Sequence, residues 1–448
     1  MTTRSLGVSL VALAALPCSL SALTSAQQSA FAAFATCISS SGSGSTCSIS
    51  VAGTYPVSTE LQVQRSNITV QGISNSPSSV VLQRAVDMPH IMSIASGLVG
   101  VTVQYLTFDG NRQNVAGGSL NCLPVSQTLY WDLDMPGVGR AVVQYDDFIN
   151  SPGTAISVYT TVPEVLPDGT EHGSVVQYCN FGAGFGSESA QQTGARTTAI
   201  IVYGTATQVI GNLIAYAGTA AINLYSDTNQ LVYENILDAN RYEQPDGVSG
   251  GQLYISAGVT NATIAENSIN GDYWMTTGTS TSANGCSLTP GLFPLGVEGF
   301  GSGHAFLNNW ITQNLYGGML LREVSGITIS GNDSLCPTCT AQYIENNGGC
   351  YDGLPSNEKC MQGWPSYIRP AGININNENG SGFATNIAFD MVRVRSNGHW
   401  GLNLTGVTGG PGFEGTQCIY NNLTNNLNVS NSSSVYGSYT EASPSSCQ

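Results

Sequence analysis

The chain of 448 residues carries 12 Lys and Arg against 28 Asp and Glu, a net charge of −16, and only 9% of its residues are charged. This acidic balance speaks against nucleic acids and membranes as partners, because both are bound by clustered basic side chains. The length allows one large domain or two ordinary ones. An apolar fraction of 41%, regularly spaced, excludes a disordered chain.

Residues 1–26 predict a secretory signal peptide. Arg4 precedes an apolar run from Leu6 to Leu20, and Thr24-Ser25-Ala26 offers a small-residue cleavage site. The run is short and Pro17 interrupts it, which favours a signal peptide over a membrane anchor. We therefore expect a secreted protein, extracellular or periplasmic, whose mature chain begins near Gln27.

Residues 27–38 (QQSAFAAFATCI) predict an amphipathic helix, followed by a loop that ends at residue 46. The rest of the chain reads as short strands. We expect the helix to cap the first of these units, because an open end would expose apolar core and an unpaired strand edge.

Alternating apolar runs begin at Cys47 and continue to about residue 420, and between Ala141 and Asn235 four stretches repeat one pattern of three short runs. Alternation at period two predicts strands with one buried face, and a unit that cannot bury its face alone predicts stacked coils. A polar residue marks the step between the first and second runs, at spacings of 33, 32, 23, 32, 42 and 23 residues: Asp147, Asn180, Asn212, Asn235, Asn267, Asn309 and Asn332. The Asn- and Ser-rich residues 421–448 are predicted to form a last coil and a tail.

These repeats, with VTVQYLTFDGN ending at Asn111 and GITISGN ending at Asn332, resemble the pectin-lyase-like superfamily over roughly 47–420. The resemblance implies an all-β fold, a single right-handed parallel β-helix (β-solenoid) with an N-terminal capping helix. Members include pectate and alginate lyases, polygalacturonases, uronan epimerases and adhesins. Asp146-Asp147 and Gly303-His304-Ala305 are only fragments of the polygalacturonase motifs, so no catalytic residue is carried over.

Three long interruptions precede the third run of their coils, at 241–250, 271–293 and 336–370. Insertions that share one side of a solenoid form walls around a binding face. We therefore expect a groove above the third strands.

Twelve cysteines suit an oxidising compartment, and eleven remain when Cys18 of the predicted signal peptide is set aside. Cys37 is predicted to pair with Cys47, and Cys418 with Cys447. The odd number leaves one free thiol, which we assign to Cys179. Four cysteines of one insertion form two disulfides, which we favour for a secreted loop, or a zinc site: Cys336, Cys339, Cys350 and Cys360.

The third strands are aligned by inward pairs such as Trp131/Leu133, Leu253/Ile255 and Leu295/Val297, and the outward residues follow by parity. Aromatic rings with hydroxyl groups suit sugar rings. A tyrosine ladder that packs only on itself remains the alternative. The predicted substrate-binding residues on this face are Tyr159, Tyr203, Tyr225, Tyr254, Asn223, Asn374 and Asn376.

Glu298 and Arg322 are predicted to point outward on adjacent coils, with Glu323 one residue further on. A carboxylate beside a guanidinium serves acid/base chemistry or binds a uronate, and the alternative is a structural ion pair. Asp227 lies two coils before Glu298, so their carboxylates would be about 9.6 Å apart. That spacing permits an inverting glycosidase.

Asp132 and Asp134 form a second candidate, two acids on one strand about 6.7 Å apart. They could hold calcium for a lyase or act as a hydrolase pair, and the alternative is two solvated acids. Calcium is thus a candidate only for a lyase, and the sequence leaves any further cofactor open.

We expect a monomeric, secreted polysaccharide-active enzyme, a pectinase-like glycoside hydrolase or polysaccharide lyase that cleaves a glycan in a groove along the β-helix. The alternative is a non-catalytic glycan-binding or adhesion protein, and a purely structural solenoid is a third possibility.

Overall fold

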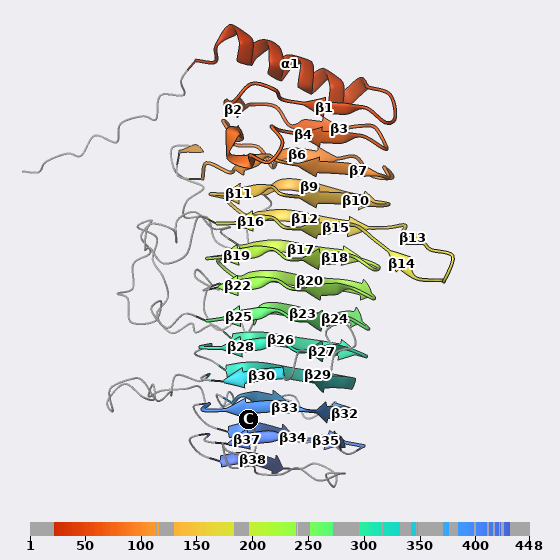
Figure 1. Cartoon of the computed structure of the whole chain (residues 1–448), viewed down its shortest axis with the longest axis vertical. Coiled ribbons are helices and arrows are strands. Elements are labelled where there is room, and N and C mark those ends of the chain that lie inside the picture. The colour runs from red at the N-terminus through yellow and green to blue at the C-terminus, as the bar shows by residue number, and fades with distance from the viewer. Residues whose placement is uncertain are drawn as a thin grey trace, which may run out of the picture.

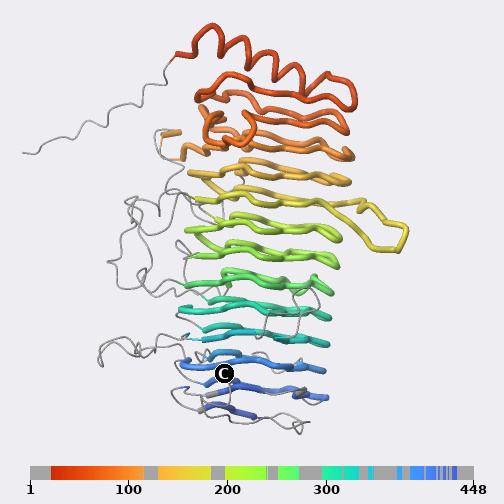
Figure 2. The backbone as a smooth tube through the Cα atoms, in the orientation of Figure 1, coloured from red at the N-terminus to blue at the C-terminus, as the bar shows by residue number. Residues whose placement is uncertain are grey.

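The computed structural model describes residues 22–112, 114–115, 130–182, 197–238, 240, 251–271, 295–314, 317–331, 342–345, 347, 371–375, 384–397, 400–409, 412–414, 417–420, 422 and 425–430. Over these residues the chain is wound into a column of stacked coils with a helix at one end (Figures 1 and 2). The predicted fold, a parallel β-helix with an N-terminal helix, is confirmed.

Helix α1 (Ser25–Ser40) lies across the end of the column, where the sequence predicted a helix at 27–38 (Figure 1). It begins earlier than predicted because Thr24 is its N-cap, within a capping box. Its Phe31 ring stacks on Tyr55 of the first coil, with centroids 5.5 Å apart, and Phe34 is buried in the core. The helix therefore covers apolar surface that an open coil end would expose.

The strands form three rows, and each strand pairs in parallel with its counterpart on the next coil. Row 1 contains β1 (Thr46–Ser48), β4 (Thr69–Gln71), β7 (Val101–Gln104), β10 (Ala141–Gln144), β15 (Val175–Gln177), β18 (Gln208–Ile210), β21 (Leu231–Tyr233), β24 (Thr263–Ala265), β27 (Ala305–Leu307), β32 (Ala384–Asp390), β35 (Val407–Thr408) and β36 (Gly412–Glu414). Row 2 contains β2 (Gly53–Val57), β5 (Val80–Arg84), β8 (Thr107–Asp109), β11 (Asp147–Ile149), β16 (Asn180–Phe181), β19 (Leu213–Ala215), β22 (Ile236–Asp238), β25 (Ser268–Asn270), β28 (Trp310–Thr312), β30 (Gln342–Glu345), β33 (Val392–Arg395) and β37 (Cys418–Tyr420).

Row 3 contains β3 (Leu61–Val63), β6 (His90–Ile94), β9 (Trp131–Val138), β12 (Thr154–Thr160), β17 (Thr198–Gly204), β20 (Ala220–Thr228), β23 (Gly251–Thr260), β26 (Leu295–Ser302), β29 (Gly317–Ser330), β31 (Ile373–Ile375), β34 (Trp400–Thr405) and β38 (Asn425–Ser430). The second half of β29 continues into row 1. Outside the rows lie the 3-10 turn η1 (Pro77–Ser79) and a projecting hairpin of β13 (Glu164–Val165) and β14 (Glu171–His172) (Figure 1).

One predicted boundary differs from the structure. β30 falls inside the stretch 336–370 that was predicted to be one insertion, and it pairs with β28 and β33 as a regular row 2 strand. β38 lies in the segment 421–448, for which a last coil was predicted, and it pairs with β34. Residues 241–250 and 272–293 of the other two predicted insertions lie outside the described residues.

Buried amides form a ladder along the corner between rows 1 and 2. Each side-chain oxygen accepts the backbone N–H of the ladder residue in the preceding coil, so Asn235 Oδ1 accepts from Asn212 at 3.0 Å and Asn267 Oδ1 accepts from Asn235 at 2.9 Å. These bonds satisfy backbone groups that the corner removes from the strand rows. From the fourth coil on, the described ladder positions are Asp146, Cys179, Asn212, Asn235, Asn267, Asn309, Gln342, Val392 and Gln417.

The predicted ladder was one residue late at its start. Asp147 pairs with Asn180, and Asn180 with Leu213, on the outward side of row 2. The residues just before them, Asp146 and Cys179, occupy the ladder. Asn332 lies outside the described residues, and Gln342 fills the position after Asn309.

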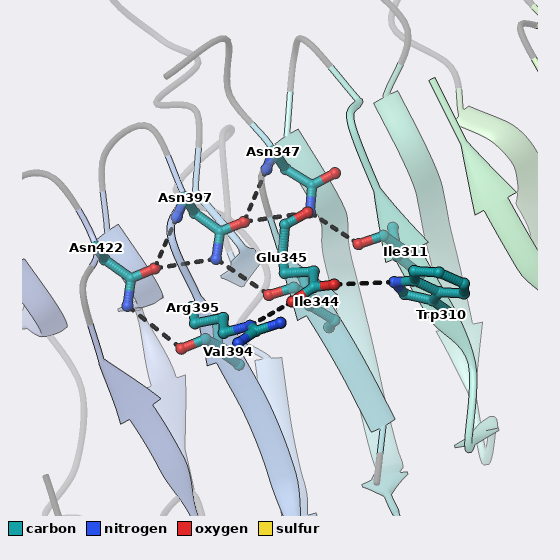
Figure 3. Close-up of polar contacts among 9 residues, drawn as sticks. All are labelled: Trp310, Ile311, Ile344, Glu345, Asn347, Val394, Arg395, Asn397 and Asn422. Carbon is teal, nitrogen blue, oxygen red and sulfur yellow. Dashed lines mark hydrogen bonds and ion pairs between the residues drawn. The ribbon is translucent and has the colours of Figure 1, made fainter. Parts of the chain in front are cut away.

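A second amide ladder, which the sequence analysis missed, follows the corner between rows 2 and 3. Figure 3 shows its last three members. Asn397 Oδ1 accepts the N–H of Asn347 at 3.1 Å, and Asn347 Nδ2 donates to the carbonyl of Ile311 at 3.0 Å. The described members are Asn240, Gln252, Asn314, Asn347, Asn397 and Asn422.

One predicted disulfide, Cys37–Cys47, is confirmed and joins α1 to β1. Cys179 is a buried free cysteine, as predicted. Cys418 is disulfide-bonded, but Cys447 lies outside the described residues, so that pairing stays a prediction. The insertion cysteines Cys336, Cys339, Cys350 and Cys360 also lie outside them.

Candidate functional site

The outward face of row 3 carries most of the predicted site residues. Its pairing defines a first outward column: Asp134, Ser157, Ile201, Asn223, Tyr254, Glu298, Leu320, Asn374, Asn403 and Asn428. The predicted alignment was displaced by two residues on two strands. Val297 aligns with Leu253, so Glu298 belongs beside Tyr254 in this column. Leu133 aligns with Ile156, so Asp134 belongs beside Ser157. A two-residue slip keeps parity, so both side chains still point outward.

Four tyrosines, here called the tyrosine strip, run along this face: Tyr159, Tyr203, Tyr225 and Tyr254. Tyr159 and Tyr203 meet edge-on, with centroids 6.2 Å apart, and Tyr203 and Tyr225 are tilted by 51° at 5.0 Å. Tyr159 is 43% exposed and Tyr225 is 51% exposed. Because these rings are tilted and do not stack in parallel, aromatic surface and hydroxyl groups both remain open to a ligand.

The predicted asparagines divide into two kinds. Asn223 lies in the first column between Ile201 and Tyr254, and its Oδ1 is buried without a hydrogen-bond partner among the described residues. Asn374 accepts from Asn403 Nδ2 at 2.7 Å in an outward amide ladder, which is a structural role. Asn376 lies outside the described residues.

Glu298 and Arg322 form an ion pair between adjacent coils, with 3.2 Å from Arg322 Nη2 to Glu298 Oε1. Glu298 is fully buried, whereas the Arg322 side chain is 12% exposed and lies over the ring of Phe300. Burial raises the pKa of Tyr254, and the neighbouring charge of Glu298 adds to that rise. The Tyr254 hydroxyl therefore stays protonated beside the pair.

Asp227 and Glu323 stand at corners where the chain leaves row 3. Asp227 (φ 78°) accepts from the N–H of Gly204 at 2.9 Å, which draws its carboxylate toward the preceding coil and away from Glu298. Glu323 (φ 50°) is exposed. The structure thus does not assemble Asp227 and Glu298 into a carboxylate pair.

Asp132 is buried, contrary to the expectation of two solvated or paired acids on one strand. Its Oδ1 lies 3.0 Å from Arg84 Nη2, and Ser151 donates to its Oδ2. Burial raises the pKa of Asp132 to about 6, although the Arg84 charge and the Ser151 hydroxyl act to lower it. Asp132 and Arg84 form a structural pair at the corner between rows 2 and 3.

Asp134 instead belongs to a cluster that the sequence analysis missed, here called the histidine cluster: Glu60, His90 and Asp134. His90 Nδ1 lies 3.1 Å from Glu60 Oε1, and His90 Nε2 lies 3.8 Å from Asp134 Oδ2. All three side chains are partly exposed, and the His90 ring packs against Trp131 at 5.3 Å. The residues lie 30 and 44 positions apart, so only the coil register brings them together.

The pKa values of the two carboxyl groups in the histidine cluster are shifted in opposite directions. Burial raises the pKa of Asp134, with Glu60 adding to the rise. The pKa of Glu60 is lowered; its burial acts to raise it, but hydrogen bonds from Ser93 and His90 outweigh that effect. Two carboxyl groups whose pKa values are shifted in opposite directions, on either side of an imidazole, are suited to proton transfer.

The two carboxylates contact opposite nitrogens of His90, so they do not converge on one point as metal ligands do. Within the described part of the chain, no group of three or more His, Cys, Asp or Glu side chains is placed to hold a metal ion. No helix there is long and apolar enough to cross a membrane.

The histidine cluster and the Glu298–Arg322 pair lie at opposite ends of the tyrosine strip. Five coil steps separate β9 from β26, which corresponds to about 24 Å at the usual strand spacing. Two groups so far apart cannot act on one glycosidic bond. The strip can therefore hold several sugar units between two charged ends.

Three rows of parallel strands, two amide ladders and an N-terminal cap define a right-handed parallel β-helix protein. The chain is similar to the A-module of mannuronan C-5 epimerase AlgE6 from Azotobacter vinelandii, with a TM-score of 0.58 and 14% identity over 93% of this chain and 94% of that one. It is also similar to DFA-IIIase from Arthrobacter chlorophenolicus A6, with a TM-score of 0.44 and 12% identity over 86% and 87%. No protein-family model matches the chain, and no curated protein matches it by sequence. At 14% identity the likeness to the epimerase shows the fold and not the reaction.

Proposed function

We propose that the protein is a secreted, monomeric polysaccharide-active enzyme, a glycoside hydrolase or polysaccharide lyase, that binds its glycan along the tyrosine strip. The observation that carries the proposal is the strip itself. It consists of four tyrosines on one outward face, with the histidine cluster at one end. The Cys37–Cys47 disulfide supports an oxidising compartment.

The histidine cluster is the proposed site of proton transfer. Asp134, whose pKa is raised, donates a proton to the glycosidic oxygen in hydrolysis, while Glu60 holds His90 in place. In elimination, His90 accepts the proton that leaves the sugar carbon, the C–H electrons form the C=C bond as the glycosidic C–O bond breaks, and Asp134 protonates the leaving oxygen. Ser157 is the register partner of Asp134, and Tyr159, two residues further along the same strand, begins the strip beside Tyr203.

The other end of the strip is proposed to bind and not to cleave. Glu298 is buried and contacts Arg322, so it acts on a glycan through the guanidinium that it positions. A positioned guanidinium suits the carboxylate of a uronate residue. The protonated hydroxyl group of Tyr254 is a further hydrogen-bond donor at this end.

A non-catalytic glycan-binding protein remains the second candidate. It is favoured by one observation, which is that neither Glu298 nor Asp132 is exposed enough to meet a substrate. In that case the tyrosine strip binds a glycan and no bond is cleaved. Calcium has a place only in the lyase form of the first proposal, where it would neutralise a uronate.

The test is to incubate the purified protein with neutral and uronic polysaccharides and to follow reducing ends together with the absorbance of unsaturated uronates. Reducing ends alone identify a hydrolase, and both signals identify a lyase. Neither signal on any substrate, with binding retained, overturns the enzyme proposal in favour of the binding protein.

Two variants then locate the chemistry. We expect Asp134→Asn to lower turnover by two orders of magnitude or more, while Glu164→Gln, on the projecting hairpin, leaves it unchanged. Turnover that is lost in Glu298→Gln and kept in Asp134→Asn would move the chemistry to the other end of the strip.

A further inference from the structure

A second set of tyrosines lies on a different part of the column, at the corner between rows 1 and 2. It is here called the tyrosine stack: Tyr105, Tyr145 and Tyr178. The rings of Tyr105 and Tyr145 are parallel within 7° with centroids 5.4 Å apart, and those of Tyr145 and Tyr178 within 11° at 5.6 Å. Tyr145 is 39% exposed and Tyr178 is 46% exposed.

The stack follows from a sequence motif that three coils share, Gln-Tyr-x-x-Phe. The glutamine before each tyrosine donates to the glutamine of the preceding coil, at 2.9 Å for Gln104 to Gln71 and 2.8 Å for Gln144 to Gln104. The phenylalanines of the motif stack in the core, with 4.9 Å between Phe108 and Phe148. Each tyrosine thus lies between a series of glutamines and a series of phenylalanines, and both series keep neighbouring coils in register.

All three tyrosines adopt left-handed backbone conformations, with φ of 58°, 57° and 53°. The same corner carries Gly211 in the next coil, where φ is 61° and a Cβ would lie 2.6 Å from Tyr178 Cε1. The corner is left-handed in other coils too, at Glu234, Glu266 and Met391, so this conformation belongs to the corner, and the stacked rings are what distinguish these three coils.

The tyrosine stack lines a cavity of about 410 Å³, together with Asn75, Pro77 and Asn180. That volume falls in the range of sites for small ligands. The segment opposite the stack is anchored, because Thr107 Oγ1 donates to the carbonyl of Pro77 at 3.2 Å. The aromatic rings and the segment of Pro77 that line the cavity are thus both held in place.

The polar groups of the cavity are neutral. Asn180 donates one amide N–H to Asp147 at 2.8 Å, which orients its side chain, and Asn75 supplies a second carboxamide. Among the described lining residues none carries a charge, and the chain as a whole has a net charge of −16. Such a cavity disfavours anions and suits a ligand with apolar faces and many hydroxyl groups.

We propose that this cavity is a second carbohydrate site, distinct from the tyrosine strip of row 3, and that it binds one or a few neutral sugar units. The tyrosine hydroxyls and the two carboxamides bond to sugar hydroxyls, and the ring edges contact the apolar face of the sugar. The site binds and does not catalyse, since no acid or base lines it among the described residues.

The test measures binding of neutral hexasaccharides of glucose, mannose, galactose and xylose, and of hexasaccharides of mannuronate and galacturonate, by calorimetry on the full chain. We expect at least one neutral probe to bind. Its affinity should fall tenfold or more in Tyr145→Ala and in Tyr178→Ala and be unchanged in Tyr225→Ala of the tyrosine strip. No binding of any neutral probe, or equal affinity in all three variants, would overturn the proposal.

A measurement on the unaltered chain covers the case that these variants do not fold. With ¹³C-labelled tyrosine rings, the neutral probe should shift the Tyr145 and Tyr178 resonances, and perturbation of Tyr203 and Tyr225 alone would contradict the proposal. The two proposals fail separately. Tyr145→Ala should leave polysaccharide turnover unchanged, and Asp134→Asn should leave binding of the neutral probe unchanged.

Discussion

Arg322 Nη2 lies 3.2 Å from Glu298 Oε1, and this ion pair links adjacent coils across two different outward columns of row 3. Glu298 shares its column with Tyr254, whereas Arg322 lies over Phe300 in the next column. A buried carboxylate needs such a partner, because an uncompensated charge in the interior is strongly destabilising. The pair thus stabilises the junction of β26 and β29 and fixes where the guanidinium stands.

Replacing Glu298 by glutamine should therefore lower stability. Gln keeps the shape of the side chain but removes the charge that faces Arg322, so we expect a loss of about 1–3 kcal/mol in the free energy of unfolding. Urea denaturation measures it. The matched control is Glu323→Gln, an exposed neighbour of Arg322, which should change stability by no more than about 0.5 kcal/mol. Equal stability of Glu298→Gln and its control would mean that the pair contributes nothing to the fold.

The amide ladder between rows 1 and 2 should depend on each of its members. Asn267→Ala removes the acceptor of the Asn235 N–H and the donor to the Val232 carbonyl, and both groups are buried. Each orphaned group costs about 1–3 kcal/mol, so we expect a loss of roughly 3–5 kcal/mol in denaturant unfolding. Ser268→Ala, on the outward side of the same corner, serves as the control and should be nearly neutral. A small effect at Asn267 would show that water replaces the ladder bonds.

Asp146 occupies a ladder position as a carboxyl group, and burial raises its pKa well above the usual value. A raised pKa in the folded state means that the contribution of this group to stability is complete at low pH. It is lost as the pH rises through the folded-state pKa. Asp146→Asn should remove this loss, so we expect it to stabilise the protein at pH 8 and to have a smaller effect at pH 4. The measurement is urea unfolding at both values, with the exposed Asp168→Asn as control. A stabilisation that shrinks as the pH rises would contradict the assignment.

Arg84 and Asp132 should behave as one buried unit. Asp132→Ala leaves the fully buried Arg84 without its carboxylate, and we expect a loss of about 3–5 kcal/mol. The double variant Arg84→Met with Asp132→Leu should recover most of that loss, because it removes both charges together. Additive losses in the double variant, measured by thermal or urea unfolding, would show that the two side chains act independently.

The fold could be predicted from the sequence because the coil repeats its alternation many times. Parity alone placed Tyr225, Arg322 and Glu298 outward. The exact ladder residue could not be predicted where two polar residues adjoin, as in Asp146-Asp147 and Cys179-Asn180. In both cases the left-handed tyrosine that precedes the pair decides which residue turns inward.

The candidate site was only partly predictable, since its geometry depends on register between coils of unequal length. Glycines at 296 and 299 leave β26 without a clear inward pattern, and this permitted the two-residue slip at Glu298. His90 gave no local signal, because its partners lie on other coils. The burial of Asp132 depends on Arg84 from row 2, which no pattern within β9 reveals.

Because α1 caps the N-terminal end of the column, we expect the coils to fold in order from that end. The cap, its disulfide to β1 and the first coil all come from the N-terminal part of the chain, which emerges first during synthesis. Together they form a first unit that is capped at one end and exposes the strand edges of the first coil at the other. We expect each later coil to add to the column by pairing with that edge. The strands and side-chain amides already present there set its register. An error of register in one coil would therefore affect the coils that follow it. Variants near α1 should for this reason lower the folding yield more than equally destabilising variants near β38.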